Sequence, residues 1–240
     1  MNQEIQEPVT TPETPNYTVP WSITDTWIGV VLLVILSLAM VTAVLLGIGK
    51  QAAQGAGIVF LELIYILPVA LIFAWRRIPW KYLGFGKFSL QTMALGCGTL
   101  VIGYVFILLH NSILSALKID TQGEQISKVL GKLNSPIWLF LASVVIAPLV
   151  EEIFFRGFLF QGFRQKYGWV AAIFLSSFFF AAAHLDLVAF IPTFILGCVL
   201  AYTFHRSNSL WPGIIFHFLI NAFGLISLYI ITQFPNLIPS

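Results

Sequence analysis

Long runs of apolar residues alternate along the chain with short polar connections. Seven apolar segments can be drawn, most about as long as the roughly 20 residues that a helix needs to cross a bilayer. They run Trp27–Ile48, Gly55–Trp75, Leu90–Leu117, Ile137–Phe163, Trp169–Leu185, Leu187–Phe204 and Leu210–Ile231. Because most connections are short, consecutive helices are predicted to be antiparallel neighbours in one bundle.

One longer connection, Lys118–Pro136, predicts a short amphipathic helix. Its apolar residues Ile126, Val129, Leu130 and Leu133 share one helical face, and Lys, Asp, Glu and Gln occupy many of the other positions. Such a helix is typical of the interface between membrane and water.

The composition excludes an ordinary soluble domain. Of the 240 residues, 58% are hydrophobic and 9% are charged, whereas soluble domains contain about 25% charged residues. The mean hydropathy is +0.91. The sequence therefore predicts an all-α, polytopic membrane bundle of about seven spans. We find no internal repeat, no second domain and no basic patch of the kind that binds nucleic acid.

The first 24 residues differ from the rest of the chain. They contain three glutamates and four prolines but no Lys or Arg, so they lack the basic start of a secretory signal. We expect residues 1–24 to be a disordered polar tail and residues 25–240 to be the membrane domain. The two cysteines, Cys97 and Cys198, lie inside apolar segments, which predicts buried small side chains and neither a disulfide nor a metal site.

The distribution of Lys and Arg predicts a cytoplasmic N-terminus. With that orientation the inside loops hold eight basic residues and the outside loops four, or seven against four without Arg156, which can lie within a helix. The inside set is Arg76, Arg77, Lys81, Lys87, Arg156, Arg164, Lys166 and Arg206, and the outside set is Lys50, Lys118, Lys128 and Lys132. We expect a multi-pass protein of the cell membrane.

Several polar residues interrupt the apolar segments, where a charge costs about 2.5–3.5 kcal/mol on insertion scales and therefore faces a cavity or a partner. The candidates are Glu62, His110, Asn111, Glu151, Glu152, Arg156, His184, His217 and Asn221. For Glu62, and for His110 with Asn111, a packing role is the favoured interpretation, because neither lies in a further pattern.

Helical spacing sorts the remaining candidates. Glu152 and Arg156 are four residues apart, which predicts an ion pair, whereas Glu151 points elsewhere and has no cation at that spacing. His217 and Asn221 also share one face, and His184 follows Phe180 by four residues. Depths counted along the helices allow Glu151, His184 and His217 to meet in one pocket. A packing role remains an even alternative for any one of these residues.

A common pocket of this composition favours hydrolysis. A carboxylate without a cation in an apolar environment is a stronger base than one in water, which suits a general base at cellular pH. One Glu and two His are also the ligand set of some catalytic zinc sites. The amide of Asn221 adds a donor for a developing oxyanion. The implied reaction is the hydrolysis of an amide bond, with or without a divalent metal such as Zn²⁺.

Three motifs occur in order on these apolar segments: EEIFFR at Glu151–Arg156, FAAAH at Phe180–His184 and HFLIN at His217–Asn221. They resemble the EExxxR, FxxxH and HxxxN/D signatures of the CAAX-protease and bacteriocin-processing family of intramembrane endopeptidases. Gly197 and the entry into the last helix also stand where the family has theirs. The resemblance covers Ile137 to Phe223, and the first three segments carry no motif.

The resemblance implies roles for the matching residues. Glu151 is expected to activate water, and His184, His217 and Asn221 to complete the site, either as a metal site or without a metal. Glu152 and Arg156 are expected to be a supporting pair. The implied substrate is a membrane-associated protein or peptide, of CAAX or bacteriocin type.

Two other classes of protein remain open. Buried Glu and His also serve as proton relays in proton-coupled transporters, although we see neither inverted repeats nor broken helices. The third alternative is a catalytically silent membrane scaffold.

Overall fold

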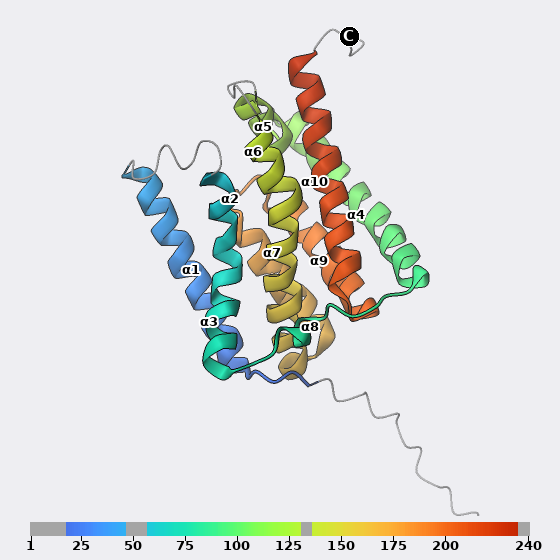
Figure 1. Cartoon of the computed structure of the whole chain (residues 1–240). Helices are drawn as coiled ribbons and strands as arrows, with labels where there is room; N and C mark the ends of the chain where they lie inside the picture. The colour runs from blue at the N-terminus through green and yellow to red at the C-terminus, as the bar shows by residue number, and fades with distance from the viewer. Residues whose placement is uncertain (1–17, 47–56, 131–135, 235–240) are drawn as a thin grey trace, which may run out of the picture.

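The computed structural model describes residues 18–46, 57–130 and 136–234, and in this part of the chain every regular element is a helix (Figure 1). The predicted all-α membrane bundle is therefore confirmed. In chain order the helices are α1 (Ile23–Leu45), α2 (Gly57–Glu62), η1 (Leu63–Tyr65), α3 (Ile66–Arg76), η2 (Trp80–Leu83), α4 (Leu90–Ala116), α5 (Gln122–Leu130), α6 (Ile137–Phe140), η3 (Leu141–Ile146), α7 (Ala147–Glu152), η4 (Ile153–Phe160), α8 (Gln161–Ala183), α9 (Phe190–Ser207) and α10 (Leu210–Gln233).

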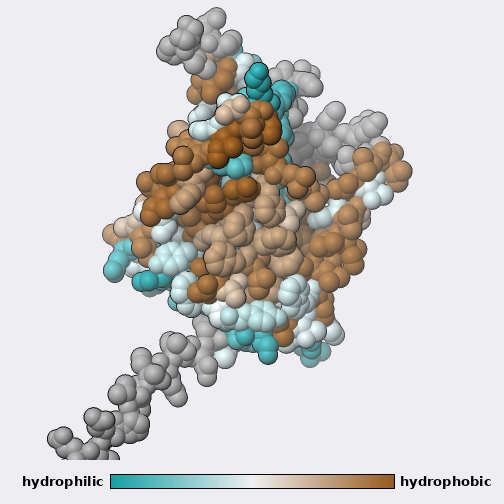
Figure 2. Space-filling model, turned by 180° about the vertical axis from the view of Figure 1, so that it is seen from behind, coloured by the Kyte–Doolittle hydropathy of each residue, from teal (hydrophilic) through white to brown (hydrophobic). Residues whose placement is uncertain are grey.

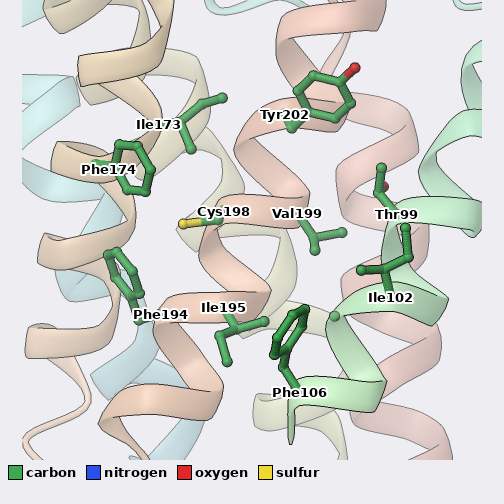
Figure 3. A pocket seen from close by; sticks show the side chains of 11 residues that line it. Thr99, Ile102, Phe106, Ile173, Phe174, Phe194, Ile195, Cys198, Val199 and Tyr202 are labelled. Atoms are coloured by element: carbon green, nitrogen blue, oxygen red, sulfur yellow. The ribbon is translucent and has the colours of Figure 1, made fainter.

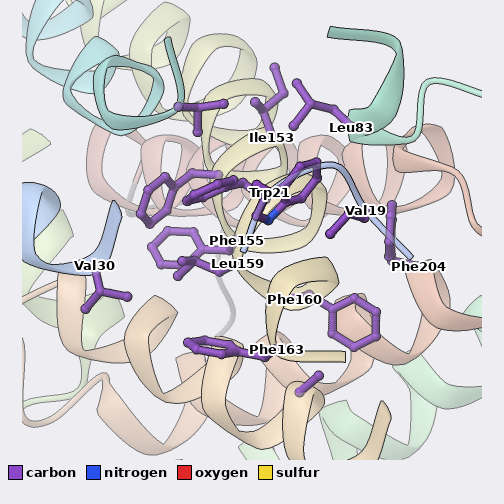
Figure 4. Packing of buried hydrophobic residues seen from close by; sticks show 14 of the residues in the cluster. Val19, Trp21, Val30, Leu83, Ile153, Phe155, Leu159, Phe160, Phe163 and Phe204 are labelled. Atoms are coloured by element: carbon purple, nitrogen blue, oxygen red, sulfur yellow. The ribbon is translucent and has the colours of Figure 1, made fainter. Parts of the chain in front are cut away.

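A rod made of α6, η3, α7 and η4 continues without a break into α8 and lies at the centre of the bundle (Figure 1). Every residue of the π-helical segment η4 is buried. Around η4, α7 and α8, phenylalanine side chains meet Trp21, Leu83 and Phe204 from other parts of the chain (Figure 4). A helix covered on all sides needs apolar residues on all faces, which accounts for the continuous apolar run around the EEIFFR motif.

Gly168 ends the first rod and starts the second. Its φ of 81° and ψ of 167° are not helical, and only glycine adopts this region readily. The 47-residue stretch Ile137–Ala183 would span about 70 Å as one straight helix at about 1.5 Å per residue, more than twice the roughly 30 Å hydrocarbon core. The predicted segments Ile137–Phe163 and Trp169–Leu185 are therefore two rods joined at a sharp bend.

Five helical stretches of the described chain are long and apolar enough to cross a membrane: Ile23–Ala43, Val59–Arg76, Leu90–Ala116, Ile137–Ala183 and Leu210–Gln233. Helix α9, which overlaps the predicted segment Leu187–Phe204, is not one of them. It carries His205 and Arg206 in its last turn, and Gly197, Leu200 and Phe204 are among its buried residues.

The predicted amphipathic helix is present as α5. On it, Leu130 is buried, and partly buried Ile126 packs with it against Leu225 of α10. Leu133 lies outside the described residues. The apolar face of α5 therefore contacts the bundle itself.

The boundary of the predicted polar tail is corrected by the structure. Residues 1–17 lie outside the described part, but Val19 and Trp21 are buried in the core cluster and α1 already begins at Ile23. Trp21 packs against Phe73 and Phe158, with ring centroids 5.3 and 5.5 Å apart. The end of the tail is thus part of the packed fold.

The prediction for the cysteines is partly wrong. Both thiols are free, but Cys97 is exposed and Cys198 is only half-buried. An exposed position on α4, a candidate membrane span, suits a small apolar side chain because lipid surrounds it there.

Basic residues gather at one end of the bundle, at the bottom of Figure 1, which we call the basic end. It holds the end of α3, η2, the start of α8 and the end of α9, with Arg76, Arg77, Lys81, Lys87, Arg164, Lys166 and Arg206. The hydrophobic surface gives way to more hydrophilic residues at this end (Figure 2). At the opposite end, the described basic residues are Lys118 and Lys128, and Lys128 pairs with Asp120.

Candidate active site

The two adjacent glutamates lie at the C-terminal end of α7, between the π-helical segments η3 and η4. π-helical turns are rare and often occur at functional sites. The exposed fraction is 5% for Glu151 and 0% for Glu152. Neither carboxylate is therefore placed where water can solvate it freely.

His217 of α10 lies against both glutamates. Its Nε2 is 3.7 Å from Oε2 of Glu151, and its Nδ1 is 3.4 Å from Oε1 of Glu152. Neither contact is a hydrogen bond: 3.7 Å is too long for one, and Nδ1 is buried without a hydrogen-bond partner in the described structure. The helical spacing had suggested a free Glu151. In the structure it has the imidazole of His217 beside it instead.

The predicted ion pair between Glu152 and Arg156 is present. Nη1 of Arg156 donates to Oε1 of Glu152 over 2.7 Å, and Nη2 donates to the carbonyl oxygen of Gly197 over 3.1 Å. The guanidinium carbon also lies 4.3 Å from the ring centroid of Phe180, a cation–π contact. Three kinds of contact thus fix Arg156, which is 1% exposed.

His184, directly after the last residue of α8, is held by a residue of that helix. Its Nδ1 lies 2.8 Å from the carbonyl oxygen of Phe180. Because a carbonyl only accepts, Nδ1 carries the hydrogen, and the neutral ring keeps its lone pair on Nε2. The ring centroid of Phe180 is 5.0 Å from that of His184 and 5.7 Å from that of His217. Phe180 therefore packs between the two histidines.

Asn221 follows His217 by one helical turn on α10. Its amide nitrogen donates to the carbonyl oxygen of Ser143 in η3 over 2.8 Å. An amide nitrogen carries two hydrogens, so this contact orients the group and leaves a second donor. The bond also joins α10 to the rod that carries Glu151.

The structure thus brings Glu151, Glu152, Arg156 and His217 into one buried cluster, with His184 joined to it through Phe180. That Glu151, His184, His217 and Asn221 form one catalytic site stays a prediction.

Two supporting residues were not recognised from the sequence. Phe180 entered as part of a spacing and as the first residue of the FAAAH motif, without a role of its own, although it contacts Arg156 and both histidines. Gly213 of α10 has no side chain where a Cβ would lie 2.7 Å from Oε2 of Glu152. A glycine one turn before a histidine on an apolar helix is a weak signal, because small residues are common at helix contacts in membranes.

Glu62 lies closer to the site than its packing interpretation suggested. Glu62 of α2 and Tyr65 of η1 interact electrostatically with Glu151. The ring of Tyr65 also packs on Phe155, with centroids 5.7 Å apart. His110 and Asn111 contact each other instead, with Nδ1 3.4 Å from Oδ1.

The expected zinc ligands do not form a ligand group. Within the described residues, no three His, Cys, Asp or Glu side chains are grouped as they would be to hold a metal ion. Nδ1 of His184 contacts the carbonyl oxygen of Phe180, and Nε2 of His217 lies 3.7 Å from Oε2 of Glu151. Both are contacts between protein groups. We therefore derive no step through a metal.

The described structure is a helical membrane bundle that buries Glu151 and His217 beside a Glu152–Arg156 pair. The sequence model of the family described as Type II CAAX prenyl endopeptidase Rce1-like matches residues 133–223. The resemblance seen in the three motifs is therefore confirmed, because the family model matches the part of the chain that carries them.

Similar proteins support the same class. The chain is 25% identical over 181 residues to a Bacillus subtilis (strain 168) protein named "Putative membrane peptidase YdiL", covering 72% of each chain. It is 28% identical over 182 residues to UPF0177 protein YxdF of Lactococcus lactis subsp. lactis (strain IL1403), covering 72% of this chain and 98% of that protein. No solved structure matches significantly. The family and the first relative support an intramembrane protease.

Proposed function

We propose that this protein is an intramembrane endopeptidase that cleaves a membrane-associated peptide with water activated by Glu151. The observation that carries the proposal is the buried contact between Glu151 and His217, beside the Glu152–Arg156 pair. A carboxylate that lies within reach of the attacking water and accepts its proton raises the reaction rate by roughly 10²–10⁴-fold.

In the proposed reaction Glu151 takes a proton from water, and the hydroxide forms a bond to the carbonyl carbon of the scissile peptide. The negative charge that develops on the carbonyl oxygen is stabilised by the second N–H of Asn221. Glu151 then returns the proton to the amide nitrogen as the carbon–nitrogen bond breaks. The products are an amine and a carboxylic acid.

The histidines position the reactants. Nε2 of His217 lies 3.7 Å from Oε2 of Glu151, so both groups can contact the same water molecule. Nε2 of His184 can accept a hydrogen bond, because its Nδ1 donates to the carbonyl oxygen of Phe180. Arg156 neutralises Glu152, so that Glu151 is the carboxylate left to act as base.

The substrate is a peptide of CAAX or bacteriocin type, and the site opens toward the cytoplasm at the basic end. The family description supports a CAAX-type peptide. The excess of Lys and Arg at the basic end supports the orientation, with a cytoplasmic N-terminus in the cell membrane.

A cleavage assay in liposomes tests the proposal. Two fluorogenic peptides serve as probes: one ends in a farnesylated Cys-aliphatic-aliphatic-Ser sequence, and its twin lacks the farnesyl group. Glu151→Gln should abolish cleavage, whereas Glu124→Gln, at an exposed position of α5, should retain it. Cleavage by Glu151→Gln at the wild-type rate would rule out the proposed base. Proton flux that depends on Glu151, without cleavage of either peptide, would favour a transporter instead.

A further inference from the structure

A groove runs along α9 between α4 and α8, and Glu151 is not among the residues that line it. Its volume is about 350 Å³, within the range of roughly 300–1,000 Å³ found for small-molecule sites. Cys198 and Val199 of α9 form its floor, Ile102 and Phe106 of α4 one wall, and Phe174 of α8 the other (Figure 3). The lining is almost entirely apolar.

The groove opens on a surface that belongs to the membrane. Ile102, Phe106 and Phe174 lie in candidate spans, and 53–60% of each residue is exposed. An extended peptide would bring backbone N–H and C=O groups into this apolar groove without hydrogen-bond partners, and each such group costs roughly several kcal/mol. An alkyl chain brings none. The chemistry of the lining therefore selects a hydrocarbon chain.

Tyr202 links the groove to the basic end. Its ring lines the groove at the end farthest from Phe106 (Figure 3), and it packs on His205, with centroids 6.4 Å apart. His205 in turn stacks on Trp169, with centroids 4.7 Å apart and planes 5° from parallel. Trp169 is half-exposed. Tryptophan and tyrosine are enriched at the level of lipid headgroups.

The aromatic cluster of Tyr202, His205 and Trp169 lies in a positive field. Burial, followed by the positive charges of Arg164 and Arg206, lowers the pKa of His205. In the described part of the chain, the acidic residue at this end is Asp25, and it is paired with Arg76. Nδ1 of His205 is buried without a hydrogen-bond partner among the described residues. A negatively charged phosphate group would relieve this field.

We propose that the groove and the cluster at its end bind one anionic phospholipid. An acyl chain lies in the groove between α4 and α8, and the phosphate lies beside Arg206 and His205. The apolar groove and the basic cluster are separate observations that Tyr202 joins, and neither depends on peptidase activity. The acyl chain and the charge of the ligand are thus recognised by different residues.

Lipid titration of the purified full-length chain tests the proposal. Delipidated protein in detergent is titrated with dioleoyl phosphatidylglycerol, with dioleoyl phosphatidylcholine, which has the same chains without net charge, and with inorganic phosphate. Bound lipid is counted by native mass spectrometry, and the melting temperature is followed in parallel. Two pairs of variants separate head from chain: Arg206→Gln with its control Arg77→Gln, and Ile102→Trp with its control Val101→Trp.

We expect one phosphatidylglycerol to bind more tightly than phosphatidylcholine and to raise the melting temperature. Arg206→Gln should weaken the apparent Kd about fivefold, the effect of one basic residue at an anionic surface, and Arg77→Gln should not. Ile102→Trp fills the groove and should abolish the one-to-one complex, whereas Val101→Trp, at a neighbouring position that is 66% exposed and not part of the lining, should retain it.

Four results would overturn the proposal. Equal binding of the two lipids, or equal behaviour of Arg206→Gln and Arg77→Gln, would remove the headgroup site. A wild-type complex in Ile102→Trp would place the acyl chain elsewhere. Equal stabilisation by inorganic phosphate would assign the basic cluster to a free anion.

Discussion

Nε2 of His217 lies 3.7 Å from Oε2 of Glu151, and both side chains are buried. This contact joins α10 to the central rod through residues that are far apart in the sequence. It gives Glu151 a neighbour that can position water with it. His217 also lies 3.4 Å from Glu152, so the two glutamates are distinguished by Arg156, which forms an ion pair with Glu152. The predictions below separate the roles of the two glutamates and of the residues that support them.

Glu151→Gln should remove the base and keep the shape of the site. We expect activity to fall by at least about 10²-fold, the low end of what a general base contributes. The melting temperature in detergent should stay near that of the wild type, because Glu151 has no ion pair with a Lys or Arg among the described residues. Cleavage rate and melting curve are measured on the same preparation. An active Glu151→Gln variant would contradict the assignment.

Glu152→Gln should act on stability first. It leaves Arg156 buried without its counter-charge, at a cost of roughly 3–5 kcal/mol in the free energy of unfolding. The double variant Glu152→Gln with Arg156→Met should recover part of this loss, because no unpaired charge remains. Chemical denaturation of the three proteins gives the comparison. If Glu152→Gln is stable but inactive, the roles of the two glutamates are reversed.

Gly213→Ala tests the close approach of α10 to the central rod. The added Cβ would lie 2.7 Å from Oε2 of Glu152, so the helix or the carboxylate must move. We expect a loss of about 1–3 kcal/mol in the free energy of unfolding, as for overpacking in a core, and a lower cleavage rate.

Gly224→Ala, on the same helix, is the matched control for Gly213→Ala. Its Cβ would meet no atom within 4 Å, so the variant should retain both stability and activity. Equal effects of the two substitutions would show that helix propensity, and not the contact with Glu152, determines the result.

Gly168→Ala tests the bend between the two rods. A Cβ there would meet no atom within 4 Å, so the whole effect comes from the φ of 81°. We expect a loss of about 1–3 kcal/mol in stability, the cost of a non-glycine residue in this region of backbone space. Gly86→Ala, which is equally open and has no positive φ, should be neutral in the same melting experiment.

Cysteine labelling tests the orientation. In a background without Cys97 and Cys198, Lys81→Cys at the basic end should be protected from an impermeant maleimide added to intact cells. Lys128→Cys at the opposite end, where Lys128 is exposed, should react. The exposed Cys97 makes this background necessary. The reverse labelling pattern would place the basic end outside the cell and move the opening of the site with it.

Several features of this protein follow from the sequence alone. The helices, their membrane character and the amphipathic α5 depend on composition and on spacing within one segment, which are local properties. The pair of Glu152 and Arg156 was predicted for the same reason, because residues four apart on a helix meet whatever surrounds them.

The tertiary structure decided the rest. The position of His217 against both glutamates, the packing of Phe180 between the histidines, and the contact that requires Gly213 all join different helices. The polar tail was drawn too long for the same reason, since Val19 and Trp21 are buried by residues distant in the sequence. A helix that is apolar on every face gives no periodic signal for its rotation, so only packing determines which of its side chains meet.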